Sequence, residues 1–166
     1  MNFASHPRIL VVDPKPSNLA VLVRRLGAEG YRVTTAVDGM AALAAMHRAP
    51  ADLILAEFSM TPMSGVALTQ AVRGQAGWRD LPVILITGRS ETGGVVRALE
   101  GGADDVVVKP FHFEVLAARI ARQLQRADGL RQLRADMAAM DARVAERAIE
   151  LGELKHRMLE STSPQP

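Results

Sequence analysis

Four polar residues each stand at the end of a short apolar run: Asp13, Glu57, Thr87 and Lys109. Two carboxylates, a hydroxyl and an ammonium group gathered in one place would suit a phosphoryl group and its cation. Phosphoryl transfer to a carboxylate needs a nucleophile, a divalent metal and fixed donors. Glu57 matters most, because it supplies the carboxylate that follows the apolar run 53–56. Whether the four residues meet depends on the elements that carry them.

Composition restricts the class of protein that can carry this set. The chain has 166 residues, 48% of them hydrophobic, which is enough for one core with roughly 40 residues left over. The net charge of +2 gives no reason to expect a nucleic-acid or membrane surface. The absence of cysteine excludes disulfides and thiolate chemistry. Because no signal peptide or membrane-length apolar run is found, we expect a soluble, cytoplasmic protein with no nucleic-acid or membrane partner.

Two periodicities alternate along the first part of the chain. Short apolar runs rich in β-branched residues predict five buried strands, at 9–12, 33–36, 53–56, 83–86 and 106–108. Between them, apolar residues recur with helical spacing, as at Leu19, Leu22 and Leu26. This alternation is typical of an α/β fold with a doubly wound, five-stranded parallel sheet. Polar residues at the carboxyl ends of such strands gather in one crevice, so the four polar residues should lie together.

Four stretches of the chain, in order, resemble the receiver domain of two-component response regulators. They are Ile9–Asp13, Asp52–Glu57, Leu81–Thr87 and Gly101–Phe111. The resemblance covers about residues 8–127 and implies the flavodoxin-like strand order 2-1-3-4-5. It also implies a role in phosphorelay signal transduction and not in enzymatic catalysis.

The resemblance implies a role for each residue of the set. In the family, two adjacent acids and an acceptor aspartate bind Mg²⁺, while a lysine and a threonine or serine hold the phosphoryl oxygens. Asp13, Thr87 and Lys109 match this pattern, but Pro14 replaces the second acid and Glu57 replaces the acceptor. Mg²⁺ tolerates poor oxygen ligation badly, so the metal site at Asp13 should be weak or absent, and no cofactor is expected. The longer Glu57 side chain displaces its carboxylate by roughly 1.5 Å, and an error of about 1 Å can cost about a hundredfold in rate.

Three roles are open to Glu57. Its carboxylate can stand in for a phosphorylated aspartate, paired with Lys109 and near Thr87, and so bias the domain to one state. It can instead fill a retired pocket and control nothing, or retain some phosphotransfer. We expect biased or degenerate signalling. Val106 stands where the family places its switch aromatic, so the link from pocket to surface should be altered as well.

Glycines precede two of the predicted helices. The fourth helix should open within Ser90–Gly94, where two glycines cost roughly 1 kcal/mol each and should leave the region mobile. Gly65 is expected to supply a turn before the third helix and nothing more.

After residue 127 the apolar pattern becomes that of a coiled coil. A helix continuous with the fifth receiver helix is predicted from 128 to 160, with a disordered tail at 161–166. Its a and d positions form a seam of about four heptads, interrupted only by the charge of Arg147. The dimer seam consists of Leu130, Leu133, Met137, Met140, Val144, Leu151, Leu154 and Met158.

A seam of this length needs a partner helix, and a homodimer is the economical choice. The flanking charges leave a parallel or antiparallel pair open. A parallel pair would bring Glu150 near Lys155, which is favourable, but Asp136 near Asp141, which is not. A helix folded back on its own receiver is the alternative to a dimer.

The sequence therefore predicts an atypical response regulator that is not phosphorylated in the ordinary way and acts through dimerisation and protein contacts. A histidine kinase, a phosphotransfer protein or an effector would be its partner. Two alternatives stay open. The chain is a working phosphoacceptor that regulates a downstream output domain, or it is a purely structural coiled-coil adaptor.

Overall fold

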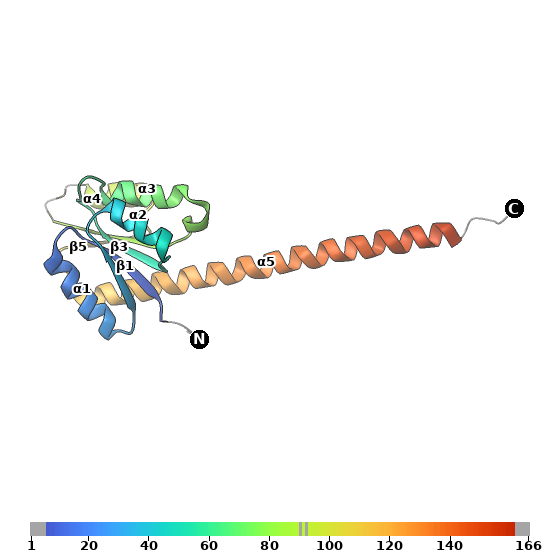
Figure 1. The fold of residues 1–166 in the computed structure, drawn as a ribbon, viewed down its shortest axis with the longest axis horizontal. Coiled ribbons are helices and arrows are strands. Elements are labelled where there is room, and N and C mark those ends of the chain that lie inside the picture. The colour runs from blue at the N-terminus through green and yellow to red at the C-terminus, as the bar shows by residue number, and fades with distance from the viewer. Residues whose placement is uncertain (1–5, 90, 92, 162–166) are drawn as a thin grey trace. The chain divides into compact units, whose positions relative to one another are not determined.

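A computed structural model describes residues 6–89, 91 and 93–161. Five parallel strands form one sheet in the order β2-β1-β3-β4-β5, with helices on both of its faces (Figure 1). The predicted α/β receiver fold is confirmed. The strands are β1 (Arg8–Val12), β2 (Arg32–Ala36), β3 (Leu53–Glu57), β4 (Val83–Thr87) and β5 (Asp105–Val108).

The helices divide between the two faces of the sheet. Helix α1 and the first part of α5 cover one face, and α2, α3 and α4 cover the other. The helical elements are α1 (Pro16–Ala28), α2 (Gly39–Arg48), α3 (Gly65–Gly74), the short 3-10 helix η1 (Ala76–Trp78), α4 (Gly94–Glu100) and α5 (Phe113–Ser161).

Successive residues of the central strands belong to different halves of the core. Ile9 and Val11 of β1 pack in one cluster with Leu26 of α1 and Ile120 of α5. Leu10, between them, lies in the second cluster, beneath α2, α3 and α4. Side chains alternate between the faces of a strand, and both faces are covered here. That is why β1 and β3 read as continuous apolar runs.

Strand β2 departs from the prediction of five buried strands. Of its five residues only Ala36 is buried, so the predicted burial is wrong for this strand. The reason is its position: β2 pairs with β1 alone and forms one edge of the sheet. The threonines Thr34 and Thr35 are exposed there.

Helix α4 begins at Gly94, the last residue of the stretch in which its start was predicted. Ser90 and Thr92 of that stretch lie outside the described part of the chain. The buried residues of α4 are Gly94 and Ala98, while the side chains of Val95 and Val96 are exposed. The helix therefore presents apolar side chains to the surface.

The chain divides into two compact units, residues 1–127 and 128–166. In the first, the buried residues of α5 include Leu116, Ile120, Leu124 and Ala127. In the second, every described residue from 128 to 161 is exposed. Ser161, predicted to open the tail, is the last residue of α5, and residues 162–166 of the predicted tail lie outside the described residues.

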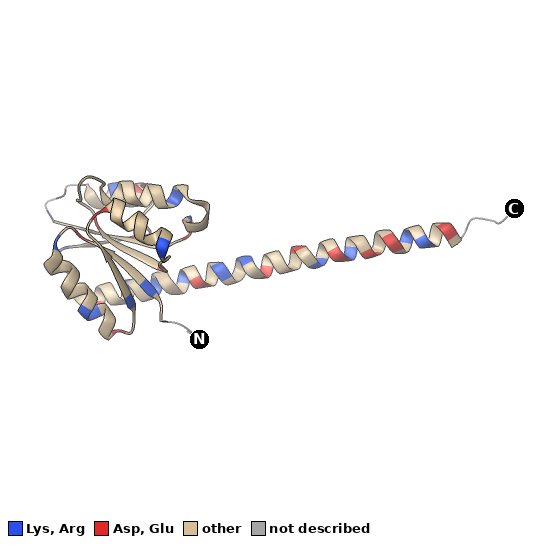
Figure 2. Ribbon diagram, viewed as in Figure 1, with Lys and Arg blue, Asp and Glu red and all other residues tan. Residues whose placement is uncertain are grey.

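Charges of both signs are interleaved along the second unit's helix (Figure 2). The seam residues between them are exposed, from 39% at Leu130 to 66% at Leu151. A single helix cannot bury an apolar row on its own surface. The partner helix that would cover this row remains a prediction. Within the described residues, no helix is both long and apolar enough to cross a bilayer.

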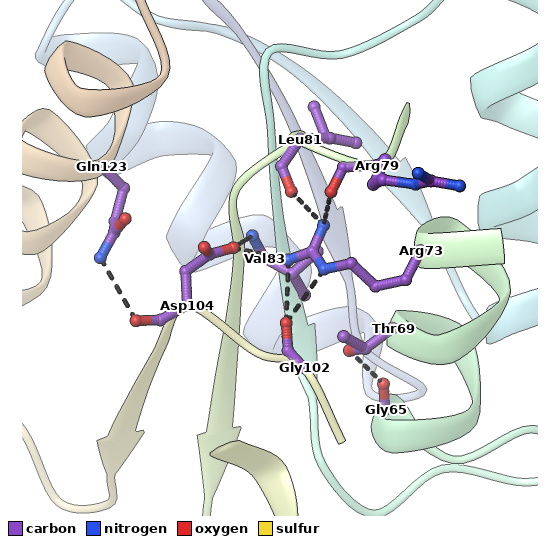
Figure 3. Close-up of polar contacts among 9 residues, drawn as sticks. All are labelled: Gly65, Thr69, Arg73, Arg79, Leu81, Val83, Gly102, Asp104 and Gln123. Carbon is purple, nitrogen blue, oxygen red and sulfur yellow. Dashed lines mark hydrogen bonds and ion pairs between the residues drawn. The ribbon is translucent and has the colours of Figure 1, made fainter. Parts of the chain in front are cut away.

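One polar cluster links helix α3 to the segments that precede strands β4 and β5 (Figure 3). Arg73 of α3 donates hydrogen bonds to the carbonyls of Leu81 at 2.7 Å, Gly102 at 2.9 Å and Arg79 at 3.1 Å. It also forms an ion pair with Asp104 at 2.6 Å. One guanidinium group therefore ties α3 to the segment before β4 and to the segment before β5.

Candidate functional site

The sheet topology brings the four predicted residues to one edge. Glu57 and Thr87 are the last residues of β3 and β4, and Asp13 and Lys109 directly follow β1 and β5. These four strands are neighbours in the order β1-β3-β4-β5. Because all run parallel, their carboxyl ends share one edge of the sheet, as the sequence predicted.

Glu57 and Lys109 form an ion pair across this edge. The Lys109 ammonium group donates a hydrogen bond to Oε2 of Glu57. The Glu57 side chain is only 11% exposed, whereas that of Lys109 is 38% exposed. A carboxylate removed from water is stabilised by a cation and by hydrogen bonds to its charged form, and Lys109 supplies both.

The carboxylate of Asp13 is already engaged by local partners. Asp13 is 4% exposed, and its Oδ1 accepts a hydrogen bond from the Lys15 amide at 2.7 Å while its Oδ2 accepts one from Asn18 at 2.9 Å. The next residue, Pro14, has no side-chain oxygen and lines a surface cavity together with Ser59. Across the described residues, no three His, Asp or Glu side chains are grouped so as to hold a metal ion.

Thr87 contacts a carboxylate that the sequence reasoning did not include. Thr87 is 1% exposed. Its hydroxyl donates a hydrogen bond to Oε2 of Glu91. The Gly88 amide approaches the same oxygen at 3.3 Å, and the Ser59 hydroxyl donates to Oε1. The predicted contact of Thr87 with Glu57 is replaced by this contact with Glu91.

Gly65 does more than supply the predicted turn. It is the first residue of α3, and its amide donates to the Phe58 carbonyl at 2.9 Å. A Cβ atom added there would lie 2.5 Å from the Glu57 carbonyl oxygen. Since backbone cannot yield cheaply, only glycine lets α3 begin this close to the end of β3.

Val106, at the predicted switch position, is a core residue. It is 9% exposed, pairs with Leu85 of β4 and packs in the cluster beneath α2, α3 and α4. A small aliphatic side chain occupies the place of the family's aromatic ring, so the described site contains no ring on β5 that could turn toward Thr87.

Glu91 and Ser59 are the site residues that sequence reasoning missed. A signal for Glu91 was present: an acid four residues beyond the strand-end Thr87, just before the pair Gly93–Gly94. The glycines were read only as a cost to the helix. Ser59 follows Glu57 by two residues, and nothing in its spacing distinguishes it from an ordinary loop serine.

The environment of Glu91 favours its charged form. Burial raises the pKa of this carboxyl, but hydrogen bonds from Ser59, Thr87 and Gly88 and the nearby charge of Arg97 lower it by more. The pKa therefore lies below the ordinary value of 4.5.

This lowered pKa gives the Glu91 contacts a defined pH dependence. They should stabilise the fold fully above about pH 4.5, the unfolded value, and lose their effect as the pH falls through the folded-state pKa. The free energies of unfolding of the wild type and Glu91→Gln, measured by urea titration, should differ near neutral pH and converge in acid. Glu100→Gln, at an exposed site on α4, is the control. A difference for Glu91→Gln that widens as the pH falls would contradict the assignment.

Comparison with known proteins identifies the domain. The model of the response regulator receiver domain matches residues 9–121. The transcriptional regulatory protein PrrA of Mycobacterium leprae is 39% identical over 122 residues, covering 74% of this chain and 52% of that protein. The DNA-binding response regulator MtrA of Mycolicibacterium smegmatis is 37% identical over 119 residues, covering 72% and 51%. The chain thus spans about half the length of these relatives.

Solved structures agree on the fold. A signal receiver domain of a histidine kinase from Syntrophus aciditrophicus is 36% identical with a TM-score of 0.68, covering 72% of this chain and 90% of that one. NtrX from Brucella abortus is 28% identical with a TM-score of 0.71, covering 78% and 29%. The match of the family model over residues 9–121 and the identity to curated regulators show that this chain belongs to the response regulator receiver family.

Proposed function

We propose that this chain is an atypical receiver, not phosphorylated in the ordinary way, in which Glu57 replaces the acceptor and biases the domain to one state. The observation that carries the proposal is the ion pair between Glu57 and Lys109. Lys109 is the cation expected to hold a phosphoryl oxygen, and here it is held by a carboxylate of the chain itself. Glu57 supplies one negative charge where a phosphoryl group would supply nearly two.

Metal chemistry supports the same proposal. Both oxygens of Asp13 accept hydrogen bonds from Lys15 and Asn18. Binding Mg²⁺ there would require at least one of them to be given up, and Pro14 offers no replacement oxygen. A cation that demands near-octahedral oxygen ligation at about 2.1 Å should bind weakly at such a site.

Signalling would then depend on contacts with other proteins. The exposed seam after residue 127 fits a second copy of the chain, and the receiver would contact a histidine kinase, a phosphotransfer protein or an effector in the cytoplasm. In this proposal the chain acts as a signalling protein and not as an enzyme. The interleaved charges beside the seam suit a pairing that depends on salt concentration.

A second candidate is a working phosphoacceptor that controls an output domain. It is favoured by relatives whose names describe transcriptional regulation and DNA binding. It would require Glu57 to release Lys109 and to accept a phosphoryl group with a side chain one methylene too long. We favour the first proposal because the first requirement would break the observed ion pair and the second would displace the nucleophile.

Exposure of the full chain to Mg²⁺ and acetyl phosphate, followed by intact mass, tests the proposal. The wild type should keep its mass, because the nucleophile is displaced and the metal site is incomplete. Pro14→Asp combined with Glu57→Asp restores both acids and should gain one phosphoryl group, while Glu57→Asp alone should react much more slowly. A stoichiometric adduct on Glu57 of the wild type would overturn the proposal in favour of the second candidate.

A further inference from the structure

Charged residues on one flank of the dimer seam alternate in sign. Four of the residues that directly precede an a position are charged: Asp136, Arg143, Glu150 and Arg157. All four are exposed. Asp136 accepts a hydrogen bond from the neutral amide of Gln132 at 2.9 Å, and within the described part of α5 no ion pair engages the other three. These charges are therefore available to a second helix.

We propose that the seam pairs with a second copy of the chain in antiparallel orientation and in a single register. Reversing one helix brings the same flank of both helices together. Asp136 then lies beside the partner's Arg157, and two turns further on Arg143 lies beside an acid. That acid is the partner's Glu150, and the two-fold symmetry repeats both contacts. This orientation rests on the homodimer of the proposed function and specifies it further.

The alternating signs select one register. Sliding one helix by a heptad in one direction would set Arg143 against its own copy and Asp136 against the partner's Glu150. Sliding it the other way would set Glu150 against its own copy and Arg143 against the partner's Arg157. Like charges would meet in every one of these contacts, and such clashes give a pairing its specificity. The register that pairs the greatest length of the seam is also the one that matches all four charges.

The apolar residues of the seam agree with the same register. Met137 lies opposite the partner's Leu154. One turn further on, Met140 lies opposite the partner's Leu151. Both leucines line one hollow on the surface of the helix, and methionine, which is unbranched and flexible, fills irregular space of this kind. A parallel pair would instead place each of these residues against its own copy, methionine on methionine.

A parallel pair would also bring like charges together. Arg147, the charged residue among the d positions, would face its own copy across the seam, with two guanidinium groups in contact. On the flanks, Asp136 would face the partner's Asp141. The favourable contact of Glu150 with the partner's Lys155 offsets only one of these two clashes.

The antiparallel pair treats Arg147 differently. There it lies opposite the partner's Val144, and its long side chain can extend past this small apolar neighbour to water. The unfavourable flank contact of this orientation is that of Arg134 with the partner's Lys155. Two kinds of matched charge pair oppose this single clash, so the charges favour the antiparallel orientation.

The orientation decides which ends of the helices meet. Leu130, at the start of the seam, would lie beside the partner's Ser161, the last residue of α5. The two copies of Leu130 would then be roughly 45 Å apart, at about 1.5 Å per residue, whereas a parallel pair would bring them into contact. Each end of the pair would thus be built from two different segments, and a protein that binds there would recognise both chains at once.

Cross-linking of the full chain tests the orientation. The chain contains no cysteine, so Met137→Cys and Leu154→Cys each introduce a single thiol. The two variants, mixed and treated with a short bismaleimide, should give a product that joins one chain of each kind, identified by intact mass. Each variant alone should give little product, because the two copies of position 137 would be roughly 25 Å apart in the antiparallel pair.

Charge exchange tests the register. Arg143→Glu should raise the dissociation constant about tenfold at low salt, because it turns two attractive contacts into repulsive ones. Adding Glu150→Arg to it restores opposite charges and should bring the constant back to within about twofold of the wild type. Glu146→Arg, at an exposed position outside the seam and its flanks, should change it little. In a parallel pair Arg143 would face Ala148, and Arg143→Glu would have little effect.

The possible results separate this inference from the proposed function. Cross-linking of each cysteine variant to itself, without the mixed product, would show a parallel pair and overturn the inference while leaving the homodimer intact. A dimer that gives neither product, or Arg143→Glu without effect on dissociation, would overturn the register. A wild-type chain that sediments as a monomer would instead contradict the homodimer itself.

Discussion

Replacement of Leu151 and Leu154 by glutamate in the full chain is expected to convert a dimer into a monomer. The two residues occupy neighbouring a and d positions of the seam and are 66% and 50% exposed in the single chain. In a pair of helices they would be buried against the partner, and burying four unpaired carboxylates per dimer is costly. We expect the dissociation constant to rise at least about a thousandfold, which corresponds to about 4 kcal/mol. Sedimentation equilibrium at several protein concentrations measures it.

Ile149 provides the matched control. It is as exposed as Leu151, at 64%, and equally apolar, but it lies outside the a and d positions. Ile149→Glu should therefore leave the dimer intact, because the new side chain would face water in the monomer and in the dimer alike. A monomeric wild-type chain would refute the dimer. If both variants dissociated equally, the helices would pair through a different face.

The parallel sheet and the edge that carries the site were predictable from strong patterns, and the strand order was predictable from the resemblance to receiver domains. Buried parallel strands give uninterrupted apolar runs, and the residue after each run must lie at the carboxyl edge. That reasoning placed Asp13, Glu57, Thr87 and Lys109 together. It failed for the burial of β2, because an edge strand and a central strand can share a β-branched composition while only one of them is covered on both sides.

The partner of Thr87 was beyond the reach of pattern reasoning for a different reason. Glu91 meets Thr87 through a segment with no periodicity, and its direction is set by a positive φ at Gly93 and by the space that Gly94 leaves. A sequence pattern shows which glycines lower helix stability. It does not show where a glycine allows a neighbouring side chain to reach a strand end. Asp13 illustrates the same limit, since its hydrogen bonds to Lys15 and Asn18 depend on the local turn at the start of α1.

For the dimer seam, the sequence pattern predicts a partner helix, whereas the structure of a single chain shows only the helix that would pair. The heptads predict a partner, because only pairing removes such a row of apolar residues from water. The structure of one chain leaves the row exposed and adds that α5 is helical throughout Phe113–Ser161. The helix is therefore formed in a geometry that can pair without refolding, which lowers the entropy lost on association.

Loss of the Arg73 cluster should produce the largest change in the stability of the receiver unit. Arg73→Leu would remove the partners of the Leu81 and Gly102 carbonyls and leave Asp104 without its cation. The Arg73 and Asp104 side chains are only 23% and 27% exposed, so water replaces these contacts incompletely. Several charge-assisted hydrogen bonds lost together should lower the free energy of unfolding by about 3 kcal/mol. The melting temperature should fall by about 10 °C.

Arg79→Leu is the control for this prediction, because it removes an exposed arginine six residues away while leaving its backbone carbonyl in place for Arg73. Urea titration at one fixed protein concentration keeps dimerisation from altering the comparison. Asp104→Asn should lie between the two, since an amide oxygen can still accept the Val83 amide, now 2.9 Å from the Asp104 carboxylate. If Arg73→Leu were no more destabilising than Arg79→Leu, the cluster would be a surface network without structural weight. A large loss would instead mean that the segments leading into β4 and β5, and with them Thr87 and Lys109, are positioned by one guanidinium group on α3.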